Sequence, residues 1–198
     1  KNESSYWGNK LEEKVCEGFM DTTGKKVNRV NETVIHKTIP YFRANLDRRI
    51  VGEDAILEAK TVTAYRAKEW DDEEIPEEHI IQVMAQLAVS GKNSGYIACL
   101  IGGQRLVWRE IQRDEEMIAK IESSVKDFWN NFVLTKQPPM PTGSDRDTSL
   151  LNRLYPEAEP ETVIELPEGF EDMVGRRVEL VRMEDELEES IAEVDNKL

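Results

Sequence analysis

Two strand-like stretches, residues 41–51 and 55–62, are joined by a loop short enough to fix how they pair. Gly52-Glu53 suits a two-residue hairpin loop with glycine at its first central position. Because the residues that flank such a loop pair with each other, Asp47 is expected directly opposite Glu58. The loop therefore predicts an antiparallel strand pair in which two carboxylates face each other.

Two opposed carboxylates with Cβ atoms about 5 Å apart repel each other and need a cation nearby. Lys60 lies two residues after Glu58, on the same face of the strand, whereas Ala59 points away. A hard divalent ion is the better candidate: Asp47 and Glu58 would hold Mg²⁺, or Mn²⁺ in its place, with the backbone carbonyl of Ala59. Lys60 would then orient or help deprotonate the attacking water. The alternative is a solvent-facing strand pair with ordinary charges.

The remaining elements alternate between helical and extended patterns. Apolar periodicity and end signals predict helices over residues 5–23, 76–90 and 114–134, a strand over residues 32–38, and a hairpin of residues 95–101 and 104–111. This order predicts an α/β (α+β) fold with a central mixed sheet flanked by helices.

Turn-rich residues after 135 predict the end of the compact core, with a domain over residues 1–135 and an acidic extension over residues 136–198. The extension is expected to contain a Leu-rich turn near residues 150–155 and an amphipathic helix from about Phe170. That helix could dock on its own domain or mediate oligomers, and its spacing does not separate the two.

The formal net charge of −14 argues against a uniformly basic DNA-binding surface. Residues 157–198 hold 15 acids and 4 bases, so most of this charge lies outside the candidate site. No apolar run approaches the roughly 20 residues that span a membrane, so no membrane partner is expected. Two cysteines are too few for a disulfide scaffold, which favours a cytoplasmic location.

Further candidates lie on the predicted helices and next to the hairpin. Glu12 falls within an apolar helix face, where a carboxylate needs a partner or a metal, or else lies at the edge of that face. Gln82 and Gln86 share an uncharged helix face, so either they have buried partners or they are ordinary surface glutamines. Arg48, Thr61 and Gln86 are candidate DNA-binding residues, although a solvated strand edge explains the arginine equally well.

Five short motifs occur in an order that resembles a known family. They are Trp7–Glu12 (WGNKLE), Asn45–Asp47 (NLD), Leu57–Thr61 (LEAKT), Gln82-Val83 and Gln112–Glu116 (QRDEE). Together they resemble the lambda-type phage exonucleases, the YqaJ viral recombinase family of the PD-(D/E)XK nuclease superfamily. The match covers about residues 6–134 and implies a restriction-endonuclease-like core.

The resemblance implies a Mg²⁺-dependent 5′-to-3′ exonuclease that degrades one strand of linear double-stranded DNA for recombination. It also implies a phage or prophage origin in a bacterial host, a single-strand annealing protein as partner, and a ring-shaped trimer. By resemblance Asp47 and Glu58 match the metal ligands and Lys60 the catalytic lysine. Glu12 matches the helical glutamate near the metal, and Gln82 the glutamine beside it.

Two features depart from the family pattern. Only a few residues precede Trp7, so the segment that helps to hold the 5′ phosphate is expected to be missing. Leu46 stands where many relatives have proline. The alternatives are an endonuclease of the same superfamily and a non-catalytic DNA- or protein-interaction domain built on a nuclease core.

Overall fold

The computed structural model describes the chain except residues 1–2, 72–73, 158–162, 164 and 166. The chain divides into two compact units, residues 1–139 and 140–198, and each is described by itself. No helix in the described part of the chain combines the length and apolarity needed to cross a membrane.

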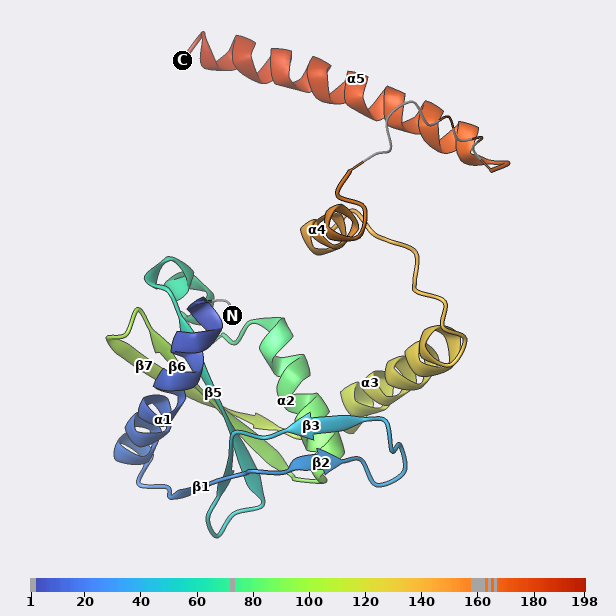
Figure 1. Ribbon diagram of the computed structural model, residues 1–198. Helices are drawn as coiled ribbons and strands as arrows, with labels where there is room; N and C mark the ends of the chain where they lie inside the picture. The colour runs from blue at the N-terminus through green and yellow to red at the C-terminus, as the bar shows by residue number, and fades with distance from the viewer. Residues whose placement is uncertain (1–2, 72–73, 158–162, 164, 166) are drawn as a thin grey trace. The chain divides into compact units, whose positions relative to one another are not determined.

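The first unit consists of helices packed on a sheet (Figure 1). Its helices are α1 (Glu3–Thr23), α2 (Glu77–Ser90) and α3 (Glu115–Phe128), with a 3-10 segment at Ala64–Trp70 and a π-helical turn at Trp129–Val133. Its strands are β1 (Val27–Arg29), β2 (Thr33–Ile35), β3 (Arg43–Asn45), β4 (Arg48–Ile50), β5 (Ala55–Val62), β6 (Ser94–Ile101) and β7 (Arg105–Gln112).

The main sheet has five strands in the order β1-β4-β5-β6-β7. Strands β5 and β6 are parallel, because helix α2 carries the chain from one to the other, and the remaining neighbours are antiparallel. Strands β2 and β3 form a separate antiparallel pair. The predicted mixed sheet flanked by helices is confirmed.

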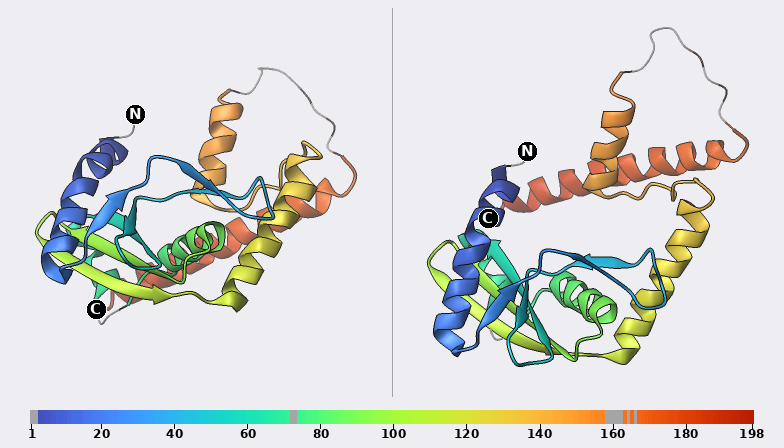
Figure 2. Two further views of the ribbon diagram at one scale, coloured as in Figure 1. Left: turned by 90° about the horizontal axis from the view of Figure 1, so that it is seen from below. Right: turned by 60° about the horizontal axis from the view of Figure 1, so that its bottom comes forward.

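Alternate side chains of the central strands enter two apolar clusters, one on each face of the sheet. On β5, Ile56 packs in the cluster that contains Val83 and Leu87 of α2. Its neighbour Leu57 packs in the cluster that contains Phe19 of α1. Helix α1 therefore covers one face and α2 the other, an arrangement that can be followed in the two views of Figure 2.

The predicted register of the first hairpin is confirmed. Arg48 pairs with Leu57, and one further step along the chain brings Asp47 opposite Glu58. Gly52 in the connecting loop has a φ of 82°, a conformation that is accessible to glycine at little cost. The loop residue thus sets the alignment of the two candidate carboxylates.

Local structure differs from the sequence-based predictions in three places. The single strand expected over residues 41–51 is split, because residues 43–45 pair with β2 while residues 48–50 join the main sheet. The strand at 27–29 has only three residues and was not predicted, since so short a segment shows no periodicity. The Leu-rich turn near 150–155 belongs to a helix whose start is capped by the Ser144 hydroxyl, which accepts from the Asp147 N–H.

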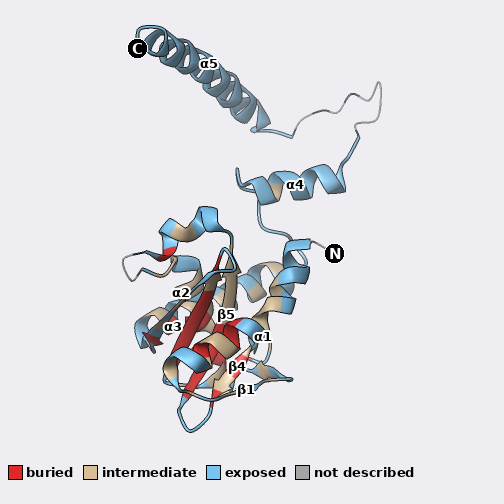
Figure 3. Cartoon of the chain, turned by 90° about the vertical axis from the view of Figure 1, so that its left-hand side faces the viewer, coloured by how far each residue is buried: buried red, intermediate tan, exposed pale blue. Residues whose placement is uncertain are grey.

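The second unit contains that helix, α4 (Asp145–Leu154), and the helix α5 (Phe170–Asp195). No residue of either helix is buried. Figure 3 shows both as exposed ribbons, in contrast with the buried strands of the first unit.

Candidate functional site

A cavity of about 360 Å³ lies beside the edge of β5, where β4 ends and leaves that edge without a strand partner. The cavity gathers residues from α1, from the chain before β4 and from β5. Its lining consists of Ser4, Ser5, Gly8, Asn9, Glu12, Asp47, Glu58, Ala59, Lys60 and Thr61. Six residues predicted from the sequence as site residues therefore line one cavity, although their chemical roles are still predictions.

Glu58 is the most constrained of these side chains, with only 5% of its surface exposed. Its Oε1 accepts a hydrogen bond from Gln82 Nε2 at 2.5 Å and lies 2.7 Å from Lys60 Nζ. Its Oε2 accepts from Gln86 Nε2 at 2.6 Å. A buried carboxylate is costly unless it is paired and hydrogen-bonded, and these three donors meet that requirement. They also fix the orientation of the carboxylate.

Gln82 links the carboxylate to the lysine. Its Oε1 accepts from Lys60 Nζ at 2.8 Å, while its amide nitrogen donates to Glu58. Because Lys60 also contacts Glu58 directly, the three side chains form a closed ring of interactions. About a quarter of the lysine side chain remains exposed, so its ammonium group is held in place at the cavity rather than buried.

Asp47 replaces the missing strand partner of β5. Its Oδ2 accepts from the backbone N–H of Ala59 at 2.8 Å, the position at which the β4–β5 ladder has ended. Burial and the neighbouring Glu58 carboxylate raise the pKa of Asp47 to about 6, against the opposing effects of the Ala59 N–H and of Lys60. The raised pKa therefore reflects the burial of the Asp47 carboxyl first and the nearby Glu58 carboxylate second.

The donor set fits a hard divalent cation. Asp47 and Glu58 supply two carboxylates beside one cavity, and the backbone of Ala59 lines the same cavity. Mg²⁺ is often held by one or two carboxylates and retains several waters. Within the described residues, no group of three or more His, Cys, Asp and Glu side chains is placed to hold a metal. The carboxylates available to a cation in this cavity are therefore the pair Asp47 and Glu58.

Glu12 lines the cavity, but its carboxylate is already bound by an arginine. Arg48 Nη1 donates to Glu12 Oε1 at 2.6 Å and to the backbone carbonyl of Asp47 at 2.7 Å, and its Nη2 donates to Glu13 at 2.7 Å. Arg48 is only 3% exposed. Arg48 therefore lies on β4 and faces α1, with its guanidinium engaged by protein groups. The phosphate contact that the sequence suggested remains a prediction.

The other two candidate DNA-binding residues differ from each other. Gln86 is 4% exposed and donates to Glu58 and, at 3.3 Å, to the backbone carbonyl of Asn45. Gln86 therefore holds the Glu58 carboxylate in place, and its predicted contact with DNA remains a prediction. Thr61 is partly exposed on the cavity wall, so its predicted contact with DNA remains a prediction.

The sequence reasoning missed the structural role of Arg48. A signal was available, because Arg48 and Ile50 lie two residues apart on a strand and therefore share a face. Both are buried on the side covered by α1. An arginine at such a position requires acidic partners from the covering helix, which Glu12 and Glu13 provide.

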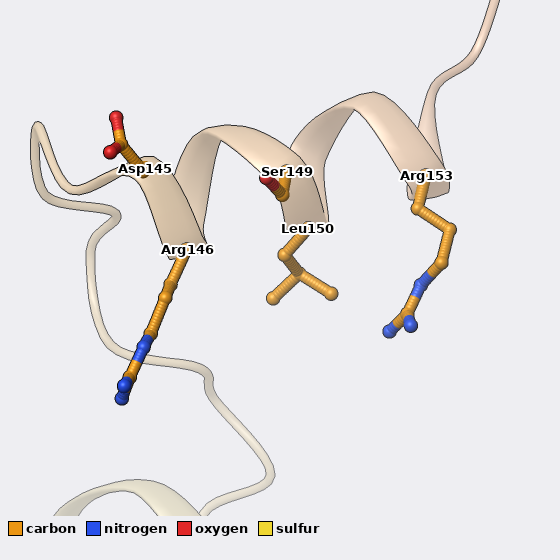
Figure 4. Close-up of a pocket in the computed structure, with 5 residues that line it drawn as sticks. All are labelled: Asp145, Arg146, Ser149, Leu150 and Arg153. Atoms are coloured by element: carbon orange, nitrogen blue, oxygen red, sulfur yellow. The ribbon is translucent and has the colours of Figure 1, made fainter. Parts of the chain in front are cut away.

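A second hollow, on α4, lacks the features of the first (Figure 4). It is lined by Asp145, Arg146, Ser149, Leu150 and Arg153, all from one helix. Figure 4 shows Arg146, Leu150 and Arg153 projecting to one side, with Asp145 directed away from them. No pair of carboxylates converges there, so the cavity beside β5 is the candidate for chemistry.

Comparison with known proteins finds a family model that matches part of the chain. A model of the YqaJ-like viral recombinase domain matches residues 1–93, the segment that contains Glu12, Asp47, Glu58, Lys60 and Gln82. Residues 1–93, just under half of the chain, are similar to that domain. The whole chain is 39% identical over 200 residues to the uncharacterized protein YqaJ of Bacillus subtilis (strain 168). It covers 63% of the length of that relative.

Solved structures share the fold of this chain. The alkaline exonuclease LHK-Exo of Laribacter hongkongensis superposes with a TM-score of 0.62 and 20% identity, covering 80% of this chain and 77% of that one. The same enzyme in complex with dAMP gives a TM-score of 0.63 at 21% identity and the same coverage. A phage-related exonuclease from Haemophilus somnus 129PT superposes with a TM-score of 0.53 and 16% identity, covering 69% of this chain and 74% of that one. The predicted restriction-endonuclease-like fold is confirmed.

Proposed function

We propose that this chain carries a divalent-metal-dependent deoxyribonuclease that acts in phage-type recombination. One observation carries the proposal: the buried Glu58 carboxylate, the Lys60 ammonium group and the Gln82 amide form a closed ring beside Asp47 on one cavity. Hydrolysis of a phosphodiester needs a base or an orienting group for water and positive charge at the phosphate. In this arrangement Lys60 can orient the water and supply positive charge at the phosphate. Asp47 and Glu58 provide a pair of carboxylates for a cation.

Each residue of the site would have its own role in the hydrolysis. Asp47 and Glu58 would hold Mg²⁺ or Mn²⁺, together with the carbonyl of Ala59. A divalent ion in such a site supplies Lewis-acid stabilisation of charge at the scissile phosphate. Lys60, held by Gln82, would orient the attacking water and take up or offset charge as the phosphorus–oxygen bond to the leaving group breaks. Gln86 would keep the second oxygen of Glu58 in place.

The finer proposal is an exonuclease that digests one strand of linear double-stranded DNA from its 5′ end. It is supported by the fold shared with two exonucleases, one of which was solved in complex with dAMP, a single nucleotide. The similarity of residues 1–93 to the YqaJ-like viral recombinase domain supports a role in recombination. The 5′-to-3′ polarity, an annealing protein as partner and a trimeric assembly rest on the motif resemblance.

Digestion of end-labelled linear duplex DNA tests the proposal. We expect shortening of the 5′-ended strand with Mg²⁺, none with EDTA, and a loss of at least about a thousandfold for Lys60→Ala, which corresponds to about 4 kcal/mol in the activation barrier. Lys120→Ala is the matched control, because Lys120 is an exposed lysine on α3 paired only with Glu116. It is expected to digest DNA at the wild-type rate.

Covalently closed circular DNA separates the two kinds of nuclease. An exonuclease leaves the closed circle intact, whereas cutting of the circle would favour an endonuclease that uses the same site. Equal digestion with Mg²⁺, with EDTA and by Lys60→Ala would contradict the proposed mechanism. Absence of digestion together with absence of metal binding would favour a non-catalytic interaction domain.

A further inference from the structure

Helix α5 exposes a regular apolar seam along its length. Its residues repeat every seven positions in two interleaved series, the spacing of a coiled-coil seam. The first series is Met173, Leu180, Leu187 and Val194, and the second is Phe170, Arg177, Glu184, Ile191 and Leu198. All of the apolar members are exposed, Leu187 by 61% and Leu198 fully. An isolated helix gains little stability in water without burial of its apolar face, so this seam calls for a partner.

The charges of α5 are segregated along the helix. Residues 170–182 carry three arginines and three acids, whereas residues 183–195 carry seven acids and no base. The second series of the seam contains one charge of each sign, Arg177 and Glu184, one heptad apart. The first half therefore has no net charge, whereas the second half is strongly acidic. A partner that complements α5 must offer an apolar seam and must keep its own acids away from the second half.

We propose that α5 pairs with α5 of a second copy of this chain in an antiparallel coiled coil. Because this pairing is two-fold, it would join copies from two different rings if the trimer proposed above forms. Antiparallel pairing places the arginine-containing half of each helix along the acidic half of the other. Parallel pairing would instead place Arg177 against Arg177 and Glu184 against Glu184, and would align the two acidic halves. Like charges in contact oppose association, so the charge pattern favours the antiparallel orientation, in which Arg177 and Glu184 of the two copies complement each other.

One register satisfies both the apolar seam and the charges. When Phe170 lies opposite Val194 of the second copy, Met173 lies opposite Ile191 and the overlap covers almost the whole helix. Arg177 then lies one layer from Glu184 of the second copy, within reach of an ion pair. The layers at the two ends are wholly apolar, and the charged residues fall in the middle, where their pairing specifies the alignment.

Sedimentation of the full chain at about 1 to 100 µM tests the pairing. We expect self-association, and we expect Leu187→Asp to weaken it at least about tenfold because a charge enters the seam. Val178→Asp is the matched control, because Val178 is also 61% exposed but lies outside the seam. It is expected to change association less than about twofold. Equal behaviour of the wild type and Leu187→Asp, or an equal loss in both variants, would overturn the proposal.

Charge reversal tests the orientation and retains the helix. In an antiparallel pair, Arg177→Glu and Glu184→Arg each place like charges near each other, and each is expected to weaken association about fivefold. The double variant Arg177→Glu/Glu184→Arg restores opposite charges and is expected to return to within about twofold of the wild type. Failure of the double variant to recover, or no effect of either single reversal, would rule out the antiparallel arrangement.

Discussion

The two units of the chain use the same types of residue in opposite ways. In residues 1–139 Leu57 is 1% exposed and packs beneath α1, whereas in residues 140–198 Leu187 is 61% exposed on α5. Ion pairs show the same contrast. The pair of Lys60 and Glu58 is largely buried at 2.7 Å, while Arg182 contacts Glu186 at 3.0 Å with most of both side chains in solvent.

In the first unit charged side chains are held in one geometry by burial, whereas on α5 they are in solvent and can change partners. A buried ion pair depends on every one of its partners, because a buried charge left alone is costly. An exposed pair on a helix contributes only about 0.3–0.5 kcal/mol, and water replaces a lost partner. Substitutions of the same kind in the two units therefore have different consequences, and paired variants can measure them.

The largest effect is expected from the buried carboxylate. Glu58→Gln retains the size of the side chain but removes the charge that Lys60 and the proposed cation require, so we expect digestion of linear DNA to fall about a thousandfold, or about 4 kcal/mol. Glu53→Gln, in the exposed loop of the same hairpin, is the control and is expected to retain activity. A Glu58→Gln variant with more than about a tenth of wild-type activity would contradict the assignment.

The second effect concerns stability. Leu57→Ala empties space in a packed layer and is expected to lower the free energy of unfolding by about 3 kcal/mol, measured by urea denaturation. Leu154 on α4 is 58% exposed. Leu154→Ala removes the same atoms and is expected to change the free energy of unfolding by less than about 0.5 kcal/mol. Similar losses for the two variants would mean that α4 is packed as tightly as the sheet.

The third effect concerns the cysteines, both of which lie in the first unit. Burial raises the pKa of the Cys16 thiol to about 11 and that of Cys99 to about 12. At pH 8 their thiolate fractions are therefore at least about a hundredfold below that of an exposed thiol, and labelling by a thiol reagent is expected to be slower by the same factor.

The same shifts predict how stability depends on pH. The folded state retains these protons to higher pH than the unfolded state, so their contribution is fully present below about pH 9 and is lost as pH rises towards 11 to 12. Urea denaturation across this range measures the loss. Rapid labelling of folded protein at pH 8 would contradict the burial of both thiols, and labelling after unfolding is the control.

The smallest effect separates two arginines. Arg48→Met leaves Glu12 and Glu13 without their shared partner and is expected to lower the free energy of unfolding by about 2 kcal/mol. Arg182→Met removes an exposed ion pair on α5 and is expected to change the free energy of unfolding by less than about 0.5 kcal/mol. If Arg48 is instead a surface residue available to DNA, the two variants will unfold at the same urea concentration.

Much of the first unit could be predicted because its signals are local. Strand β5 begins and ends at the predicted residues, and Gly91 ends α2 with a φ of 68° in the left-handed region. The loop at Gly52 fixed the register that brings Asp47 opposite Glu58. These features depend on a few adjacent residues, whose conformational preferences hold in the folded chain.

The remaining features depend on tertiary partners. The break between β3 and β4 occurs because β2 pairs with one and β5 with the other, which the continuous extended pattern of residues 41–51 does not reveal. The ring of Glu58, Lys60 and Gln82 needs α2 to pack over β5, so the sequence could predict the members and not their contacts. Arg48 was predicted to be either a DNA contact or part of a solvated strand edge, because its partners lie on a distant helix.

The central claim is that Asp47 and Glu58 form a cation site, and titration of the full chain with Mn²⁺ tests it most directly. We expect saturable binding, followed by calorimetry, that Asp47→Asn weakens at least about tenfold. Asp54→Asn, which changes an exposed aspartate paired with Lys92, is expected to bind as the wild type does. Equal affinity of the wild type and Asp47→Asn, or no saturable binding to the wild type, would contradict the claim.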